Sequence, residues 1–140
     1  MARALVDTGA IVALLNRDDP HHASVSAWFR DFRGLLLTTD AVITEIAYVL
    51  AANAELQNAA LVWAERARKA GLLAVEPVED YAALARIIGR YANLPCDYAD
   101  ASLIALAERT GTVAIATIDQ RDFSVYRIRG RKRFRILPGP

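Results

Sequence analysis

Cysteine and histidine are scarce in this 140-residue sequence, which has one cysteine and two histidines. Because Cys96 has no second cysteine to pair with, an intrachain disulfide is excluded and a cysteine-ligated zinc site is not credible. No apolar stretch approaches the ~20 residues that a membrane-spanning helix needs. The glycine patterns of a P-loop and of dinucleotide binding are also missing. The chemistry of this protein must therefore rest on other side chains.

A large net charge is lacking too, since 17 Lys and Arg residues nearly balance 16 Asp and Glu residues. With 54% apolar residues, this composition favours a folded domain with a sizeable core over a disordered chain. The first seven residues, Met-Ala-Arg-Ala-Leu-Val-Asp, turn acidic too early for a secretory signal peptide. We therefore expect a cytoplasmic protein, not a membrane protein, in which residues 1–140 form a single domain.

Short apolar runs alternate with longer amphipathic segments along the chain. Strands are predicted at residues 4–6, 35–38, 72–75 and 112–118. Helices are predicted at residues 20–33, 41–52, 55–70, 79–92 and 97–109. This alternation indicates an α/β fold, with a mostly parallel sheet of four to five strands covered by helices on both faces. The basic C-terminal segment 127–140 contains apolar positions and is a candidate edge strand.

Two acids follow predicted strands. Asp7 comes directly after the first strand, and Asp119 directly after the fourth. The carboxyl ends of parallel strands line the crevice in which such sheets bind ligands, so these two side chains are expected to face one another there. The alternative for Asp7 is a purely structural role as the N-cap of a helix that begins near Thr8.

Two further acids lie on apolar helix faces. In the predicted helix 41–52, the apolar stripe consists of Val42, Ile46 and Val49. Glu45 lies on that stripe, and Asp100 likewise shares a face with apolar neighbours such as Leu103 and Ile104. A lone carboxylate in such a place costs several kcal/mol unless it is paired or bound to a cation.

Four carboxylates brought close together would repel one another and take up protons unless a cation joins them. Oxygen-only ligands suit Mg²⁺ or Mn²⁺, which retain waters and bridge to substrate phosphates. We therefore predict a catalytic metal site with Asp7 and Asp100 as its principal ligands, completed by Glu45 and Asp119. Such a metal can activate water against a phosphodiester.

Two neighbouring acids have a structural explanation as well. Pro95-Cys96-Asp97 looks like a helix start, which makes Asp97 an N-cap and places Asp100 in a first turn that favours an anion. Asp97 is nevertheless on nearly the same side as Asp100, so an accessory metal ligand is the alternative. Asp122, three residues after Asp119, is expected to be a turn or cap residue.

A basic cluster near the C-terminus offsets these acids. Between Arg127 and Arg135 there are six basic residues and no acid, a pattern expected for a phosphate-rich partner. A solvated tail that aids solubility is the alternative. The candidate phosphate contacts are Arg121, Arg127, Arg129, Arg131, Lys132 and Arg133.

Four segments match motifs of a known family. They are Leu-Val-Asp-Thr-Gly-Ala, Thr-Glu-Ile-Ala, Tyr-Ala-Asp-Ala-Ser-Leu-Ile-Ala-Leu-Ala and Ile-Ala-Thr-Ile-Asp-Gln-Arg-Asp-Phe, at residues 5–10, 44–47, 98–107 and 115–123. Each one is unspecific, but four in this order over nearly the whole chain are a strong signal. On these residues the sequence resembles the PIN-domain ribonucleases, in particular the VapC toxins of prokaryotic toxin–antitoxin pairs.

The resemblance implies a PIN-like, Rossmann-like sheet, dependence on Mg²⁺ or Mn²⁺, and cleavage of RNA. All four acidic positions of the family are filled by the four acids described above, and its accompanying hydroxyls fall on Thr8 and Thr117. The resemblance also implies a homodimer and neutralisation by a cognate antitoxin protein that lies over the site.

Other functions remain open on the sequence alone. One is a PIN nuclease that processes RNA without being a toxin, and another is a catalytically inactive module that holds nucleic acid through its basic tail. A phosphatase with Asp7 as its nucleophile is disfavoured, because Gly9 stands where such an enzyme has a second aspartate.

Overall fold

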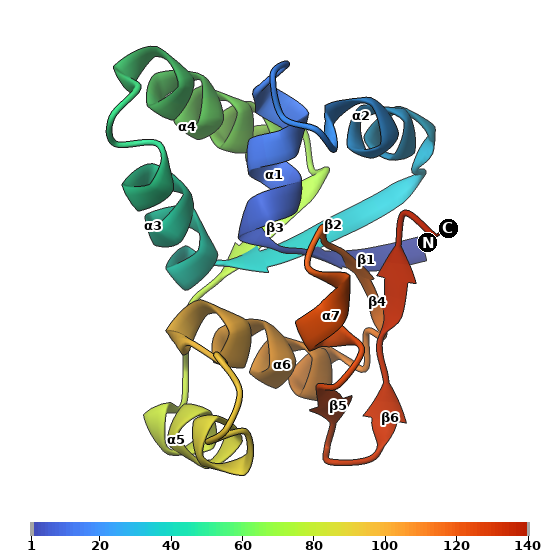
Figure 1. Ribbon diagram of the computed structural model, residues 1–140. Helices are drawn as coiled ribbons and strands as arrows, with labels where there is room; N and C mark the ends of the chain where they lie inside the picture. The colour runs from blue at the N-terminus through green and yellow to red at the C-terminus, as the bar shows by residue number, and fades with distance from the viewer. Residues whose placement is uncertain (1, 140) are drawn as a thin grey trace.

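The centre of the protein is a five-stranded sheet, seen in a computed structural model that describes residues 2–139 (Figure 1). The strand order is β3-β2-β1-β4-β7, and every neighbouring pair is parallel. The strands are β1 (Ala2–Val6), β2 (Gly34–Thr39), β3 (Leu73–Glu76), β4 (Ala114–Ala116) and β7 (Arg135–Leu137). The predicted parallel sheet is confirmed, and β7 is the edge strand expected within residues 127–140.

Helices cover both faces of this sheet (Figure 1). On one face lie α1 (Thr8–Leu15), α2 (His22–Asp31), α3 (Asp40–Val49) and α4 (Ala54–Lys69). On the other lie α5 (Tyr81–Arg90) and α6 (Tyr98–Thr110). The short helix α7 (Gln120–Phe123) and an antiparallel hairpin of β5 (Arg127–Ile128) and β6 (Lys132–Arg133) connect β4 to β7. Within residues 2–139, no helix is long and apolar enough to cross a membrane.

Local sequence accounts for most helix boundaries. Asp80 and Asp97 each accept a hydrogen bond from a backbone N–H in the first turn of the helix they precede. Gly111 ends α6 with a φ of 71°, a conformation that glycine adopts without strain. The five predicted helices are therefore confirmed with small shifts at their ends, whereas α1 had been considered only as an alternative role for Asp7.

The fourth strand is shorter than predicted, since β4 covers three residues of the expected 112–118. The chain turns after Ala116, where the hydroxyl of Thr117 accepts a hydrogen bond from the backbone N–H of Asp119 at 2.9 Å. Asp119 therefore lies at the end of this turn and not directly after the strand.

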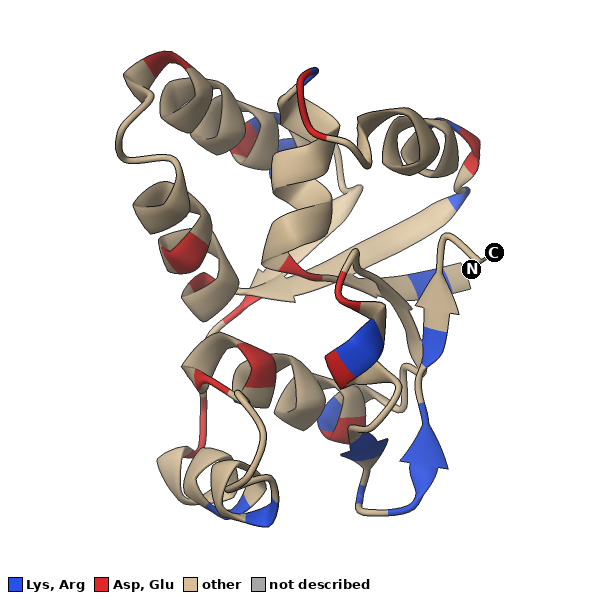
Figure 2. Cartoon of the chain, viewed as in Figure 1, with Lys and Arg blue, Asp and Glu red and all other residues tan. Residues whose placement is uncertain are grey.

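Parallel strands end at one edge of the sheet, and acidic segments gather there. Figure 2 shows red segments from α3, α6, α7 and the end of β1 around one central region, whereas blue segments gather on β5 and β6. The fold thus gathers acids from distant parts of the sequence in one region, apart from the basic residues of β5 and β6.

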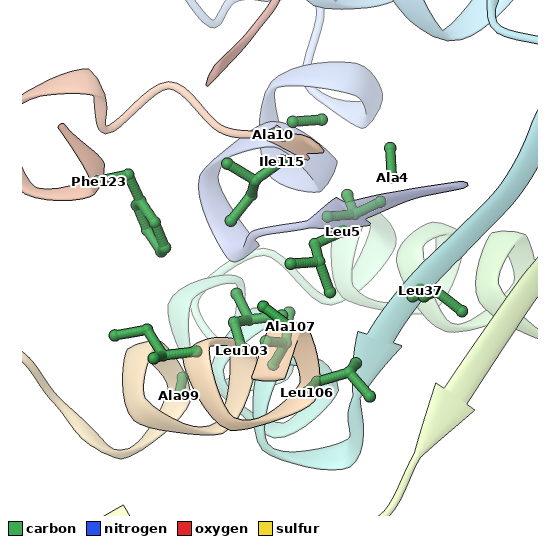
Figure 3. Close-up of a cluster of buried hydrophobic side chains, with 14 of the residues drawn as sticks. Ala4, Leu5, Ala10, Leu37, Ala99, Leu103, Leu106, Ala107, Ile115 and Phe123 are labelled. Carbon is green, nitrogen blue, oxygen red and sulfur yellow. The ribbon is translucent and has the colours of Figure 1, made fainter. Parts of the chain in front are cut away.

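The position of this sheet edge is fixed by the packing of β1 in the hydrophobic core. In Figure 3, Leu5 of β1 points toward Leu103 and Ala107 of α6, whereas Ala4 points to the opposite face of the sheet. All four side chains are fully buried. Because strands with both faces buried need continuous apolar runs, the Ala4–Val6 run fits the central strand. Asp7, the next residue, is thereby fixed at the sheet edge.

Candidate active site

A pocket of about 410 Å³ lies where β1 and β4 end. Seven carboxylates line it, and none of its lining residues in the described chain is Lys, Arg or His. The acids are Asp7, Asp19, Glu45, Asp97, Asp100, Asp119 and Asp122. The fold therefore brings the four predicted site acids together, with Asp97 beside them. Thr8 also lines the pocket.

Asp7 caps α1 and also lines the pocket, so its capping contact does not remove it from the predicted site. Its side chain is 6% exposed, and Oδ1 accepts a 2.7 Å hydrogen bond from the backbone N–H of Thr8, which caps α1. The hydroxyl of Thr117 donates to Oδ2 at 3.0 Å. Burial raises the pKa of Asp7 to about 6, although both hydrogen bonds oppose this rise.

Asp100 lies in the first turn of α6 and is 9% exposed. Its Oδ2 accepts a 3.0 Å hydrogen bond from the hydroxyl of Tyr126. Burial is the main reason why the pKa of Asp100 rises to about 8, and the charges of Asp7 and Asp97 add to the rise. The free-energy cost predicted for a charged acid on this helix face thus corresponds to the raised pKa of Asp100, which disfavours its ionised form.

Glu45 projects from α3 and is half-buried. Burial, followed by the proximity of Asp97, raises its pKa to about 7. The apolar stripe of Val42, Ile46 and Val49, on which Glu45 was predicted to lie, is only partly in the core. Val42 and Ile46 are buried, but Val49 is 54% exposed and lines the pocket. One part of the apolar face of α3 therefore packs in the core, and another part lines the pocket together with Glu45.

Thr117 links the acids that follow the two central strands. Its hydroxyl donates to Asp7 and accepts from the backbone N–H of Asp119. Asp119 is half-buried and caps the short helix α7, since its Oδ1 accepts from the N–H of Asp122 at 3.1 Å. One hydroxyl therefore sets the relative positions of two predicted ligands.

Asp97 caps α6 as expected, because its Oδ1 accepts a 2.8 Å hydrogen bond from the N–H of Asp100. It is exposed and also lines the pocket, so capping does not remove it from the site. Asp19, from the loop between α1 and α2, was not among the predicted residues. It precedes a proline in a polar segment, and such a sequence carries no signal beyond a turn.

The donor set fits a hard divalent cation. All the acids present oxygen atoms, and the buried hydroxyl of Thr8 lies beside Glu45 among them. Within residues 2–139, no three acid, His or Cys side chains are already arranged to hold a metal ion. Mg²⁺ does not need such a cage, because it keeps several waters and uses one or two carboxylates.

The predicted basic residues divide into two groups. The guanidinium of Arg127 donates to the carbonyl oxygens of Ser124, Val125 and Tyr126, and that of Arg129 donates to the carbonyl of Glu108. These two arginines are engaged in holding the hairpin. The other four are exposed and form no ion pair with described residues: Arg121, Arg131, Lys132 and Arg133.

The hairpin lies at the far end of α6 from the acids. Glu108, which Arg129 contacts, is eight residues beyond Asp100 on this helix, or about 12 Å at a rise of about 1.5 Å per residue. Arg121 is closer, because α7 also carries Asp122 of the pocket. Of the exposed basic side chains, Arg121 is therefore the nearest to the acidic pocket, the hairpin residues lie farther away, and none of them lines it.

Comparisons with known proteins agree with this geometry. Residues 4–128 match the PIN-domain family. Ribonuclease VapC26 of Mycobacterium tuberculosis is 31% identical over 134 residues, which cover 96% of this chain and 99% of that protein. A crystal structure of the M. tuberculosis toxin VapC20, described as cleaving the sarcin–ricin loop, superposes with a TM-score of 0.75. It covers 84% of this chain and 91% of VapC20, and its 19% identity supports the fold alone. The resemblance drawn from the motifs is confirmed, and the chain belongs to the PIN-domain family, within its VapC group.

Proposed function

We propose that this protein is a divalent-metal-dependent endoribonuclease that hydrolyses RNA phosphodiester bonds and acts as the toxin of a type II toxin–antitoxin pair. The observation that carries the proposal is the pocket that gathers Asp7, Glu45, Asp100 and Asp119 at the carboxyl ends of β1 and β4. The family membership and the name of the 31% identical relative supply RNA as the substrate.

We assign Mg²⁺ or Mn²⁺ as the cofactor, with Asp7 and Asp100 as principal ligands and Glu45, Asp119 and Asp97 around them. A divalent cation there would neutralise the acids, stabilise the charge that develops on the phosphate, and lower the pKa of an attacking water. The raised pKa values of Asp7, Glu45 and Asp100 support this assignment, because a cation stabilises the ionised form that burial disfavours.

The side chains of this site have separate tasks in the proposed reaction. The carboxylate of Asp7 is fixed through both oxygens by Thr8 and Thr117, which suits a ligand that must not move. Glu45 is less buried and has a pKa of about 7, so its carboxylate is suited to accept a proton from the attacking water. Thr8 and Thr117 are accessory residues that position the acids or contact a bound water.

RNA is proposed to approach over α7 and the β5–β6 hairpin. Arg121, Arg131, Lys132 and Arg133 are exposed there, which suits contacts to phosphates. A single-stranded or looped RNA should reach the acidic pocket more readily than a duplex, because the bases and backbone of unpaired regions can be splayed out. Arg127 and Arg129 are assigned to shaping this surface, since their side chains already hold backbone carbonyls.

Protein partners are proposed on the side of α3 and α4. Tyr48 and Val49 of α3 and Leu61 and Val62 of α4 are between 40% and 81% exposed. Large apolar side chains left exposed on two neighbouring helices are typical of surfaces that contact another protein. We assign this surface to a second copy of the chain or to a helix of the antitoxin, which would lie in the groove between the helices.

The central experiment measures RNA cleavage with Mg²⁺ or Mn²⁺ added and then removed by a chelator. The wild type should cleave only with metal, and Asp7→Ala and Asp100→Ala should be inactive although folded. Asp31→Ala is the matched control, because Asp31 is an exposed acid of α2 outside the pocket. Wild-type cleavage by both pocket variants would overturn the assignment. Growth arrest on expression separates a toxin from a non-toxic processing nuclease.

A further inference from the structure

One buried hydroxyl outside the predicted site contacts a proposed metal ligand. The hydroxyl of Tyr126 donates to Asp100 Oδ2 at 3.0 Å, although the two residues are 26 positions apart. Tyr126 is completely buried. We propose that Tyr126 is a positioning residue that orients the carboxylate of Asp100 for the divalent cation. This inference rests on the proposed function, and it adds a residue that the motif comparison did not identify.

The ring of Tyr126 is held from several sides. Its centroid lies 5.0 Å from the ring of Phe123 in an edge-on arrangement and 5.0 Å from the ring of Tyr91. Phe134 packs against Phe123 at 5.5 Å and extends the cluster toward β7. Aromatic contacts of this kind fix both the position and the tilt of a ring. The phenol oxygen is therefore set by the fold and does not follow the carboxylate passively.

The chemistry of the pair suits an oriented ligand. A phenol has one hydrogen to donate, and in Tyr126 that hydrogen is directed at Asp100. Its hydrogen bond occupies Oδ2 of Asp100, whereas Oδ1 accepts no hydrogen bond within residues 2–139. Both oxygens keep a lone pair that can reach a cation, and rotation of the carboxylate would break its bond to Tyr126.

Asp7 offers an independent parallel on another element. Its Oδ2 also accepts a hydrogen bond from one buried hydroxyl, that of Thr117. The two principal ligands are therefore each held by a buried hydroxyl, one from the turn after β4 and one from the segment after α7. This repetition points to orientation of the carboxylates as the shared purpose of the two bonds.

The test removes only the hydroxyl. Tyr126→Phe keeps the ring in its aromatic cluster, and Tyr91→Phe is the matched control, because the Tyr91 hydroxyl accepts from the backbone N–H of Arg127 at 2.7 Å and contacts no acid of the pocket. Mn²⁺ affinity is measured by calorimetric titration of the purified proteins without RNA. Tyr126→Phe should bind Mn²⁺ about 10- to 100-fold more weakly, whereas Tyr91→Phe should match the wild type.

Activity supplies a second measurement. Tyr126→Phe should need more Mn²⁺ for half-maximal cleavage, with an unchanged KM for RNA at saturating Mn²⁺. A wild-type Mn²⁺ affinity in Tyr126→Phe would overturn the inference while leaving the nuclease assignment intact. A wild-type affinity in Asp100→Asn would instead overturn the metal site itself.

A double mutant distinguishes positioning from general support of the fold. If Tyr126 acts through Asp100, adding Tyr126→Phe to Asp100→Asn should not weaken the remaining Mn²⁺ affinity any further. A further loss of affinity in the double mutant would show that Tyr126 acts through the fold and would overturn the inference.

Discussion

The acidic pocket and the basic β5–β6 hairpin lie at opposite ends of α6, and their charged groups are held in opposite ways. In the pocket, Asp7 and Asp100 are less than a tenth exposed, and each is tied down by a hydroxyl donor. In the hairpin, Arg131, Lys132 and Arg133 stand in solvent. Charges in solvent cost the fold little, whereas buried carboxylates of one sign destabilise it.

This difference in burial determines how strongly the charged groups of each region support a functional role. A group that destabilises the fold, and is nevertheless oriented by hydrogen bonds, needs a ligand to explain it. Exposed basic side chains are compatible with RNA binding and equally with a soluble surface. The pocket therefore carries the functional assignment, and the hairpin depends on it.

The largest effect is expected from Asp100→Asn. Loss of this ligand should lower the rate of RNA cleavage by about 1,000-fold or more, which corresponds to several kcal/mol of lost transition-state stabilisation. Single-turnover cleavage with saturating Mn²⁺ measures it. Asp31→Asn, an exposed acid in α2, should cleave like the wild type. Equal rates of RNA cleavage in Asp100→Asn and the wild type would contradict the prediction, because the buried acids of the pocket would then matter no more than the exposed charges of the hairpin.

The second prediction concerns pH. The pKa of Asp7 is raised from 3.8 to about 6 and that of Asp100 from 3.8 to about 8, so the folded protein retains protons that the unfolded chain has released. Stability of the metal-free protein should therefore fall as the pH rises from about 4 to about 8, by several kcal/mol in total. Thermal unfolding at a series of pH values measures it.

Metal should reverse this loss, because Mg²⁺ binds the ionised carboxylates of the folded protein. The increase in melting temperature on adding Mg²⁺ should be larger at pH 8 than at pH 5. Asp7→Asn should make the fall in stability between about pH 4 and 6 less steep without abolishing it, since Asp100 still contributes over that range. A melting temperature that is level from pH 5 to pH 8 would contradict the prediction.

A third, smaller effect is expected from Thr117→Val, which removes the hydroxyl shared by Asp7 and Asp119. Mn²⁺ affinity should fall about 10-fold, and the unfolding free energy should fall by about 1 kcal/mol from lost hydrogen bonds. Thr112→Val is the control, because Thr112 is also buried and its hydroxyl, among the described residues, bonds only to that of Thr110 at 2.9 Å. If both variants bind Mn²⁺ equally, the hydroxyl does not orient the ligands.

The sequence predicted the sheet, the five longer helices and the four acids that the fold gathers in one pocket, because each left a local pattern. Continuous apolar runs indicated buried strands, and misplaced carboxylates such as Glu45 stood out against apolar helix faces. Asp97 as an N-cap was likewise readable from the Pro-Cys-Asp start of its helix.

Other features depend on contacts between distant segments and left no such pattern. Asp19 reaches the pocket through a loop, and Tyr126 contacts Asp100 across 26 residues. The end of β4 was placed too late because the hydroxyl of Thr117, which closes the turn, looks like an ordinary β-branched strand residue in sequence. The exposed position of Val49 was equally hidden, because periodicity does not say where a helix face leaves the core.

The smallest effect is expected at the hairpin. The double variant Arg131→Gln/Lys132→Gln should weaken RNA binding by a few-fold for each phosphate contact it loses. The slope of log affinity against log salt concentration should fall by about 0.7 per lost contact to single-stranded RNA. Binding is measured by fluorescence anisotropy in the Asp100→Asn background, in which RNA is not cleaved.

A change in net charge alone would also weaken RNA binding, so the control must remove the same charge elsewhere. Arg66→Gln/Lys69→Gln does so on α4, where both side chains are exposed. Since the two double variants have equal net charge, a larger loss of affinity and of salt slope for the hairpin variant locates the phosphate contacts on β5–β6. Equal losses would mean that RNA senses only the overall charge of the protein, and the acidic pocket would then be the one region of the two with a specific role.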